Sequence, residues 1–241
     1  INNSMKITKS KSANITSKDL SKSFVSNVFS LMFTALIISG LSAVWFATDT
    51  MSSIIVSKVT GSLTTVGWIA TLSPLGLVLL MGAGFQKLSA KTILGIFLIY
   101  STLTGISLST IFSVYTSSSI ASTFFISAIT FGVMAVTGYT TKTDLTKMGS
   151  FLYMALIGII IASVINWFMQ SSQMHYIISI IGVLIFTGLT AYDVQKIKNI
   201  GAQVDQGSES AQKLMIMGAL TLYLDFINLF LMLLRLLGNR D

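Results

Sequence analysis

The stretch from Gly218 to Gly238, GALTLYLDFINLFLMLLRLLG, constrains this chain more than any other part. It is long enough to cross a bilayer as a helix, which takes about 20 apolar residues. Its inner half carries one carboxylate, Asp225, and Asn228 follows one turn later on the same face. An aspartate near the centre of a spanning helix costs ~2.5–3.5 kcal/mol on insertion scales, so it normally faces a protein interior or a watery cavity. The sequence therefore predicts a functional carboxylate inside a membrane protein.

The composition supports a membrane protein throughout. The chain has 241 residues, of which 53% are hydrophobic and 10% are charged, whereas a soluble domain has roughly 25% charged residues. Cysteine is absent, which excludes disulfide and thiolate chemistry. The net charge is +7, but the lysines lie between apolar runs and form no patch with interleaved aromatic residues, so we expect no nucleic-acid partner. The expected partner is the lipid bilayer, and no cofactor is expected.

The chain divides into a polar N-terminal segment and a long apolar domain. We expect residues 1–23 to form a flexible cytoplasmic tail and residues 24–241 to form a transmembrane domain. A signal peptide is the alternative reading of the start, but its apolar core would have only 7–15 residues. Seven apolar runs predict seven spans, at about Phe24–Ala47, Leu63–Met81, Thr92–Tyr115, Ile120–Tyr139, Phe151–Phe168, His175–Asp193 and Leu214–Leu237. The longest and most polar connection is expected at Val194–Lys213.

The distribution of basic residues predicts the orientation. Twelve lysines fall in the tail and in alternate connections, and three basic residues, Lys58, Arg235 and Arg240, fall on the other side. Cytoplasmic loops carry the excess of Lys and Arg. We therefore expect the N-terminus in the cytoplasm and, with seven spans, the C-terminus outside.

Asp193 is the best partner for Asp225, because it ends the preceding apolar run. Lys196 and Lys198 should lie at the cytoplasmic interface, which places Asp193 about one turn inside it. Asp225 lies seven residues beyond Gly218, ~10 Å into its helix at 1.5 Å per residue. The last two spans run antiparallel, so the sequence favours contact between the two aspartates. The alternative is that separate serine, tyrosine or backbone groups satisfy each aspartate and that both serve only packing.

If the two aspartates are in contact, proton binding and cation binding at the pair would depend on each other. Two carboxylates ~4 Å apart at an effective dielectric constant near 20 repel by ~4 kcal/mol, so the pair would hold one proton near neutral pH. When both are ionised they attract a cation. Calcium prefers 6–8 oxygen ligands, and Asp193 and Asp225 with Asn228 offer few, so we expect weak, transient calcium binding. Tyr192 and Lys87 are further candidates near the pair, Lys87 as a counter-charge.

The segments around the two aspartates resemble a known family. GLTAYDVQKIK at Gly188–Lys198 and the Gly218–Gly238 stretch are similar to signature segments of the Bax inhibitor-1 family, also called the transmembrane Bax-inhibitor-motif family. YSTLTGISLSTIF at Tyr100–Phe112 and TGYTTKTDLTKMGSFL at Thr137–Leu152 resemble its bacterial members. The resemblance implies an all-α bundle of seven transmembrane helices, six surrounding a central C-terminal one. It also implies a pH-sensitive calcium leak across the inner membrane, with Asp193 and Asp225 as the proton-sensing pair. Where some members carry an arginine at the inner end of the second span, this chain has Lys87.

Three functions remain open from the sequence. The first is the proton-regulated cation leak. The second is an interaction protein that regulates membrane proteolysis or stress survival through the N-terminal tail and the Val194–Lys213 connection. The third is an intramembrane aspartyl protease, since Tyr192–Asp193 resembles half of that catalytic pair. The Gly-x-Gly-Asp half is replaced by Tyr223-Leu224-Asp225 and the Pro-Ala-Leu element is missing, so we do not expect an enzyme.

Overall fold

The described part of the chain is helical. The structure, a computed structural model, describes the backbone of residues 2–57, 60–205 and 207–240, and the side chains in these ranges from Asp19 onward. Within these residues there is no strand, only the isolated bridges Val56–Leu63 and Tyr115–Arg240. The helices are α1 (Asn2–Phe46), α2 (Asp49–Ile55), α3 (Thr65–Gly84), α4 (Ala90–Leu108), the 3-10 helix η1 (Ser109–Ser113), α5 (Ser117–Thr140), α6 (Thr146–Met169), α7 (Ser172–Gly201) and α8 (Glu209–Leu237). The predicted all-α class is confirmed.

Seven of these helices are long and apolar enough to cross a membrane. They are the Asp19–Phe46 part of α1, then α3, then α4 with η1, then α5 to α8, and each corresponds to one predicted apolar run. The ring of six helices around a central one is not confirmed. α8 packs along α1, α4, α5 and α7, but in the described part of the chain α3 and α6 do not pack along it.

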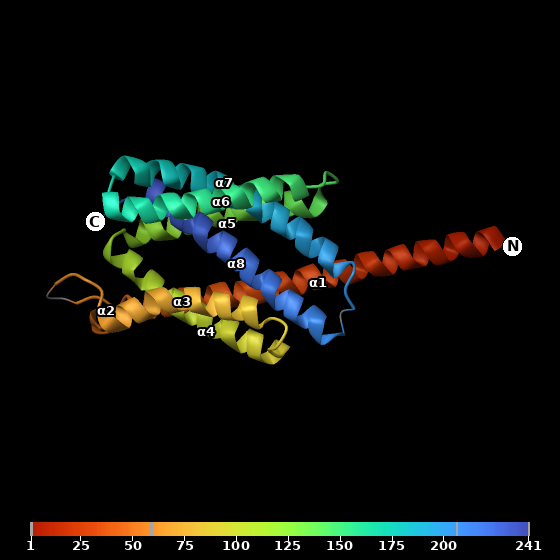
Figure 1. Ribbon diagram of the computed structural model, residues 1–241, viewed down its shortest axis with the longest axis horizontal. Helices are drawn as coiled ribbons and strands as arrows, with labels where there is room; N and C mark the ends of the chain where they lie inside the picture. The colour runs from red at the N-terminus through yellow and green to blue at the C-terminus, as the bar shows by residue number, and fades with distance from the viewer. Residues whose placement is uncertain (1, 58–59, 206, 241) are drawn as a thin grey trace.

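The spans form two groups with α8 obliquely between them (Figure 1). One group contains α1, α3 and α4, and the other contains α5, α6 and α7. Aromatic side chains one turn apart on α8 contact the two groups. Tyr223 meets the rings of Phe97 and Tyr100 on α4 at centroid distances of 6.0 and 5.6 Å. Phe226 meets the ring of Phe131 on α5 at 5.6 Å. Such close packing replaces the hydrophobic drive that lipid cannot supply between helices.

The polar connection predicted at Val194–Lys213 is wrong in its extent. α7 continues to Gly201 and α8 begins at Glu209, which leaves residues 202–208 as the connection. The reason is packing, because the Val194 and Ile197 side chains are buried in the core. Helix α7 continues beyond the apolar run because one of its faces still packs against neighbouring helices.

Residues 2–23 of the predicted 1–23 tail lie in the N-terminal part of α1. Within it, Ser21 is buried and its hydroxyl donates to the Lys198 carbonyl at 2.7 Å. The packed part of the chain therefore begins before residue 24. The side chains of residues 1–18 lie outside the described residues, so the flexibility of the tail remains a prediction. Lys58, which contributes to the predicted orientation, also lies outside them.

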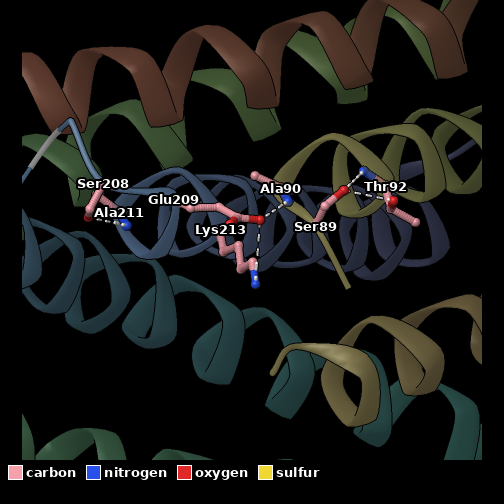
Figure 2. A network of polar contacts seen from close by, with 7 residues as sticks. All are labelled: Ser89, Ala90, Thr92, Ser208, Glu209, Ala211 and Lys213. Atoms are coloured by element: carbon pink, nitrogen blue, oxygen red, sulfur yellow. Dashed lines mark hydrogen bonds and ion pairs between the residues drawn. The ribbon is translucent and has the colours of Figure 1, made fainter. Parts of the chain in front are cut away.

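The two ends of the bundle differ in charge. We call the end with the connections 85–89, 141–145 and 202–208 the lysine-rich end, and the end that holds α2 and the 170–171 turn the opposite end. Figure 2 shows how α8 joins α4 at the lysine-rich end. The Glu209 Oε1 atom accepts the backbone N–H of Ala90 at 3.1 Å and lies 3.7 Å from the Lys213 ammonium. Ser89 and Ser208 cap the two helices by accepting the N–H groups of Thr92 and Ala211.

Candidate ion-binding site

The structure brings Asp193 and Asp225 together. Both lie on the inner faces of adjacent antiparallel helices, α7 and α8, and their exposed fractions are only 2% and 5%. The two carboxyl groups are close enough to interact electrostatically. The two aspartates are therefore neighbours in this fold, because the short 202–208 connection returns the chain directly along α7.

A tyrosine that the sequence analysis missed holds Asp193 from a third helix. The Tyr153 hydroxyl on α6 lies 3.2 Å from Oδ1 and 3.3 Å from Oδ2 of Asp193, and it donates to this carboxyl. The Tyr192 ring packs edge-on against the Tyr153 ring at 6.0 Å. A Cβ added at Gly149 would collide with the Tyr192 ring, so this glycine allows α6 to approach α7 here. Tyr192 thus supports Tyr153 and has no hydrogen bond to either aspartate among the described residues.

The positive charge beside Asp193 comes from Lys196 and not from Lys87. Lys196 lies one turn along α7, and its charge acts on the Asp193 carboxyl. Its ammonium also lies 6.0 Å from the centre of the Tyr192 ring. Lys87 is exposed in the 85–89 connection, and no contact between it and the aspartates is found in the described part of the chain. The i, i+3 spacing of Asp193 and Lys196 was the available signal for this neighbour.

A cavity of about 850 Å³ reaches Asp225 from the opposite end. Its walls come from α6, α7 and α8, with Leu75 from α3. Asp225 and Asn228 both line it, as the shared helix face predicts, and the Asn228 amide donates to the Leu224 carbonyl at 2.8 Å. Arg235 and His175 line the same cavity near the opposite end. Asp193 does not line it, so Asp225 is the member of the pair that the cavity meets.

One oxygen of Asp225 is left without a partner. Its Oδ2 is buried and finds no hydrogen-bond partner among the described residues. A buried carboxyl oxygen without a partner is costly, and such an atom is available to a water molecule or a cation. Among the described residues, no group of three or more His, Cys, Asp or Glu side chains is placed to hold a metal ion. Calcium binding here would use two carboxyls and neutral oxygens, as predicted, and it stays a prediction.

The lysine-rich side of the pair is closed by direct contacts. Gln195 accepts the Leu145 N–H at 2.9 Å through Oε1 and donates to the Thr143 carbonyl at 2.8 Å through Nε2. The Lys198 ammonium donates to the Tyr139 carbonyl at 2.7 Å. These bonds hold the end of α7 against the α5–α6 connection and the last turn of α5.

Helix α5 also touches α7 just beside the pair. A Cβ added at Gly138 would collide with the backbone of Ala191, two residues before Asp193, so the two backbones are in direct contact. No side chain separates them. On this side of the pair, α5 and α7 are therefore packed backbone to backbone.

Comparisons with known proteins identify the family. The model of the family described as "Inhibitor of apoptosis-promoting Bax1" matches residues 21–241. The chain is 46% identical over 220 residues to the inner membrane protein YbhL of Escherichia coli, covering 91% of this chain and 92% of that protein. It is 48% identical over 217 residues to an uncharacterized protein of Borreliella burgdorferi, with 90% and 92% covered. A protein of Rickettsia prowazekii is 50% identical over 174 residues, with 72% and 73% covered.

Proposed function

Because the chain belongs to the Bax inhibitor-1 family, we propose that it is a pH-sensitive leak for calcium and other cations in the inner membrane. The relative named as an inner membrane protein supports this location. The excess of lysines at one end supports an orientation with that end in the cytoplasm. With seven spans, the C-terminus is then outside.

The observation that carries the proposal is the buried Asp193–Asp225 pair, of which Asp225 lines a cavity inside the spanning helices. Ionisable groups at membrane depth mark ion and proton pathways. A stable structural role would leave both carboxyls fully hydrogen-bonded, whereas Oδ2 of Asp225 has no partner among the described residues. Because Asp225 lines the cavity, an ion that enters the cavity can approach this carboxyl group.

The pair acts as a switch because protons and cations compete for it. A hydrogen bond between two carboxyl groups requires a proton on one of them. With this proton in place the pair holds its two helices together and attracts cations weakly. Loss of the proton leaves two negative charges side by side, which repel each other and attract a cation from the cavity. A site with so few ligands releases calcium readily, which suits permeation. The leak should therefore rise as pH rises through the titration of the pair.

Calcium flux into proteoliposomes of purified protein tests the proposal over a series of pH values. Asn mimics a permanently protonated carboxyl, so Asp225→Asn and Asp193→Asn should each reduce flux to the low-pH level and remove its pH dependence. Asp49→Asn, an exposed aspartate in α2 at the opposite end, serves as the control and should behave as the wild type. Equal flux and equal pH dependence in all four proteins would contradict the proposal.

A regulator of membrane proteolysis or stress survival is the second candidate. Its contact surface would be narrower than the sequence predicts, since only residues 202–208 of the Val194–Lys213 segment lie outside helices. Proteoliposomes separate the two functions. A leak needs only protein and lipid, whereas a regulator is silent until its partner is added.

A further inference from the structure

The cavity above Asp225 opens sideways as well as toward the opposite end. α3 packs on α2 and α4, α6 packs on α7, and within the described residues α3 does not pack on α6. In Figure 1, α8 is seen between α3 and α6. Leu75 on α3 and Ile160 on α6 line the cavity and are 64% and 54% exposed. The gap between these helices therefore has apolar edges and faces the bilayer, and we call it the lateral groove.

The shape and chemistry of the lateral groove are those of a site for an amphipathic chain. Along α8 it extends from Thr221 to Arg235, a length of ~21 Å at 1.5 Å per residue. This is more than half of the ~30 Å hydrocarbon thickness. Most of its wall is aliphatic or aromatic, and Arg235 lies at its outer end, in the last turn of α8. A ligand with a long apolar body and an anionic group matches this arrangement.

We propose that the lateral groove binds a phospholipid of the surrounding bilayer, with one acyl chain along α8 and the phosphate at Arg235. Arginine pairs with phosphate through two parallel hydrogen bonds. His175, which lines the cavity at the same end, supplies a further polar contact for the headgroup. A bilayer lipid already has its phosphate at the depth of Arg235 and its chain at the depth of Asp225. It enters through the gap between α3 and α6 without leaving the membrane.

A bound acyl chain would also lie against the Asp225 side chain, which lines the cavity. It would displace water and cations from this part of the cavity, so lipid and cation would exclude each other. The mutual exclusion of lipid and cation rests on the proposed leak, whereas the lipid binding itself does not.

Native mass spectrometry tests the binding directly. The protein is extracted from vesicles of phosphatidylethanolamine and phosphatidylglycerol, and the phospholipid retained per chain is measured. The wild type should retain one phospholipid. Arg235→Gln should weaken retention about tenfold, the effect of ~1.4 kcal/mol. The control is Arg240→Gln, which removes an equal charge that lies over the Tyr115 ring outside the cavity, and it should retain lipid as the wild type does.

A second pair of variants tests the groove itself without changing charge. Ser163→Phe places a ring in the cavity and should abolish retention, whereas Ile161→Phe, on an exposed position of α6 that does not line the cavity, should leave it unchanged. Equal retention in Arg235→Gln and Arg240→Gln, or in Ser163→Phe and Ile161→Phe, would overturn the proposal. So would a dimer that buries the lateral groove against a second copy of the chain.

Calcium flux in the same vesicles tests the exclusion step. Arg235→Gln should leak more than Arg240→Gln, because its groove holds lipid less often. If no protein leaks at any pH, the proposed function fails, and lipid retention still decides whether the lateral groove is a lipid site. If the two variants leak equally while their lipid retention differs, lipid and cation do not exclude each other.

Discussion

The two ends of the α7–α8 pair satisfy their polar groups in different ways. At the lysine-rich end, Gln195 and Lys198 reach backbone groups of neighbouring segments, and Gly138 lets α5 touch α7 directly. At the opposite end, Asn228 bonds only its own helix, and one oxygen of Asp225 has no partner among the described residues. Gln195 and Lys198 thus have hydrogen-bond partners in neighbouring segments, whereas Asn228 and the Oδ2 atom of Asp225 have none in neighbouring segments among the described residues. The aspartate pair lies where these two regions meet.

The largest expected effect on stability comes from separating α5 and α7 on the lysine-rich side of the aspartate pair. Gly138→Ala places a Cβ against the Ala191 backbone, so the two helices must separate at a cost of ~3 kcal/mol, the upper range for overpacking. Thermal unfolding in detergent should show a strongly lowered midpoint. Gly132→Ala on the same helix has open space around the new Cβ and should be neutral or slightly stabilising. Equal midpoints for the two variants would mean that α5 and α7 are not in backbone contact.

A smaller loss is expected when the side-chain bonds at the same end are removed. Gln195→Ala leaves the Leu145 N–H and the Thr143 carbonyl without their partner, which should cost ~1–3 kcal/mol of unfolding free energy. Gln203→Ala changes an exposed glutamine in the 202–208 connection and should change stability very little. If Gln195→Ala is as stable as Gln203→Ala, the closed side does not depend on these bonds.

The smallest effect on stability is expected for a substitution in the cavity beside Asp225. Ser163→Leu adds apolar volume at the edge of the cavity, where space exists, so the unfolding free energy should change by less than ~0.5 kcal/mol. The same change at Ser127, which is fully buried and bonded to the Thr123 carbonyl, should destabilise strongly. A large loss at Ser163 would show that the cavity is closed in the folded protein.

The spans and the aspartate pair could be predicted from the sequence, because both depend on local pattern. Apolar length places the spans to within a few residues except at the end of α7, and a short connection makes α7 and α8 antiparallel neighbours. The extension of α7 to Gly201 could not be predicted in this way, since the burial of Val194 and Ile197 depends on what packs over them.

The residues that contact the aspartate pair and the cavity beside it could not be predicted from the sequence either. Tyr153 is one of seven tyrosines, and only the packing of α6 on α7 brings it to Asp193. Lys87 has the sequence position of a counter-charge, but the exposed 85–89 connection keeps it away from the pair. Among the described residues α3 does not pack along α6, and the cavity beside them depends on this tertiary arrangement, which no local sequence pattern indicates.

The most direct test of the proposed function determines from which side of the membrane the cavity is accessible. Because the natural chain has no cysteine, single-cysteine variants can be labelled cleanly with a membrane-impermeant cationic thiol reagent applied to one side of oriented vesicles. Thr60→Cys marks the opposite end and Gln203→Cys marks the lysine-rich end, since both residues are exposed in connections. We expect Asn228→Cys to react from the side that labels Thr60→Cys and to be protected from the other side. Reaction of Asn228→Cys from the Gln203→Cys side, or from neither side, would contradict it.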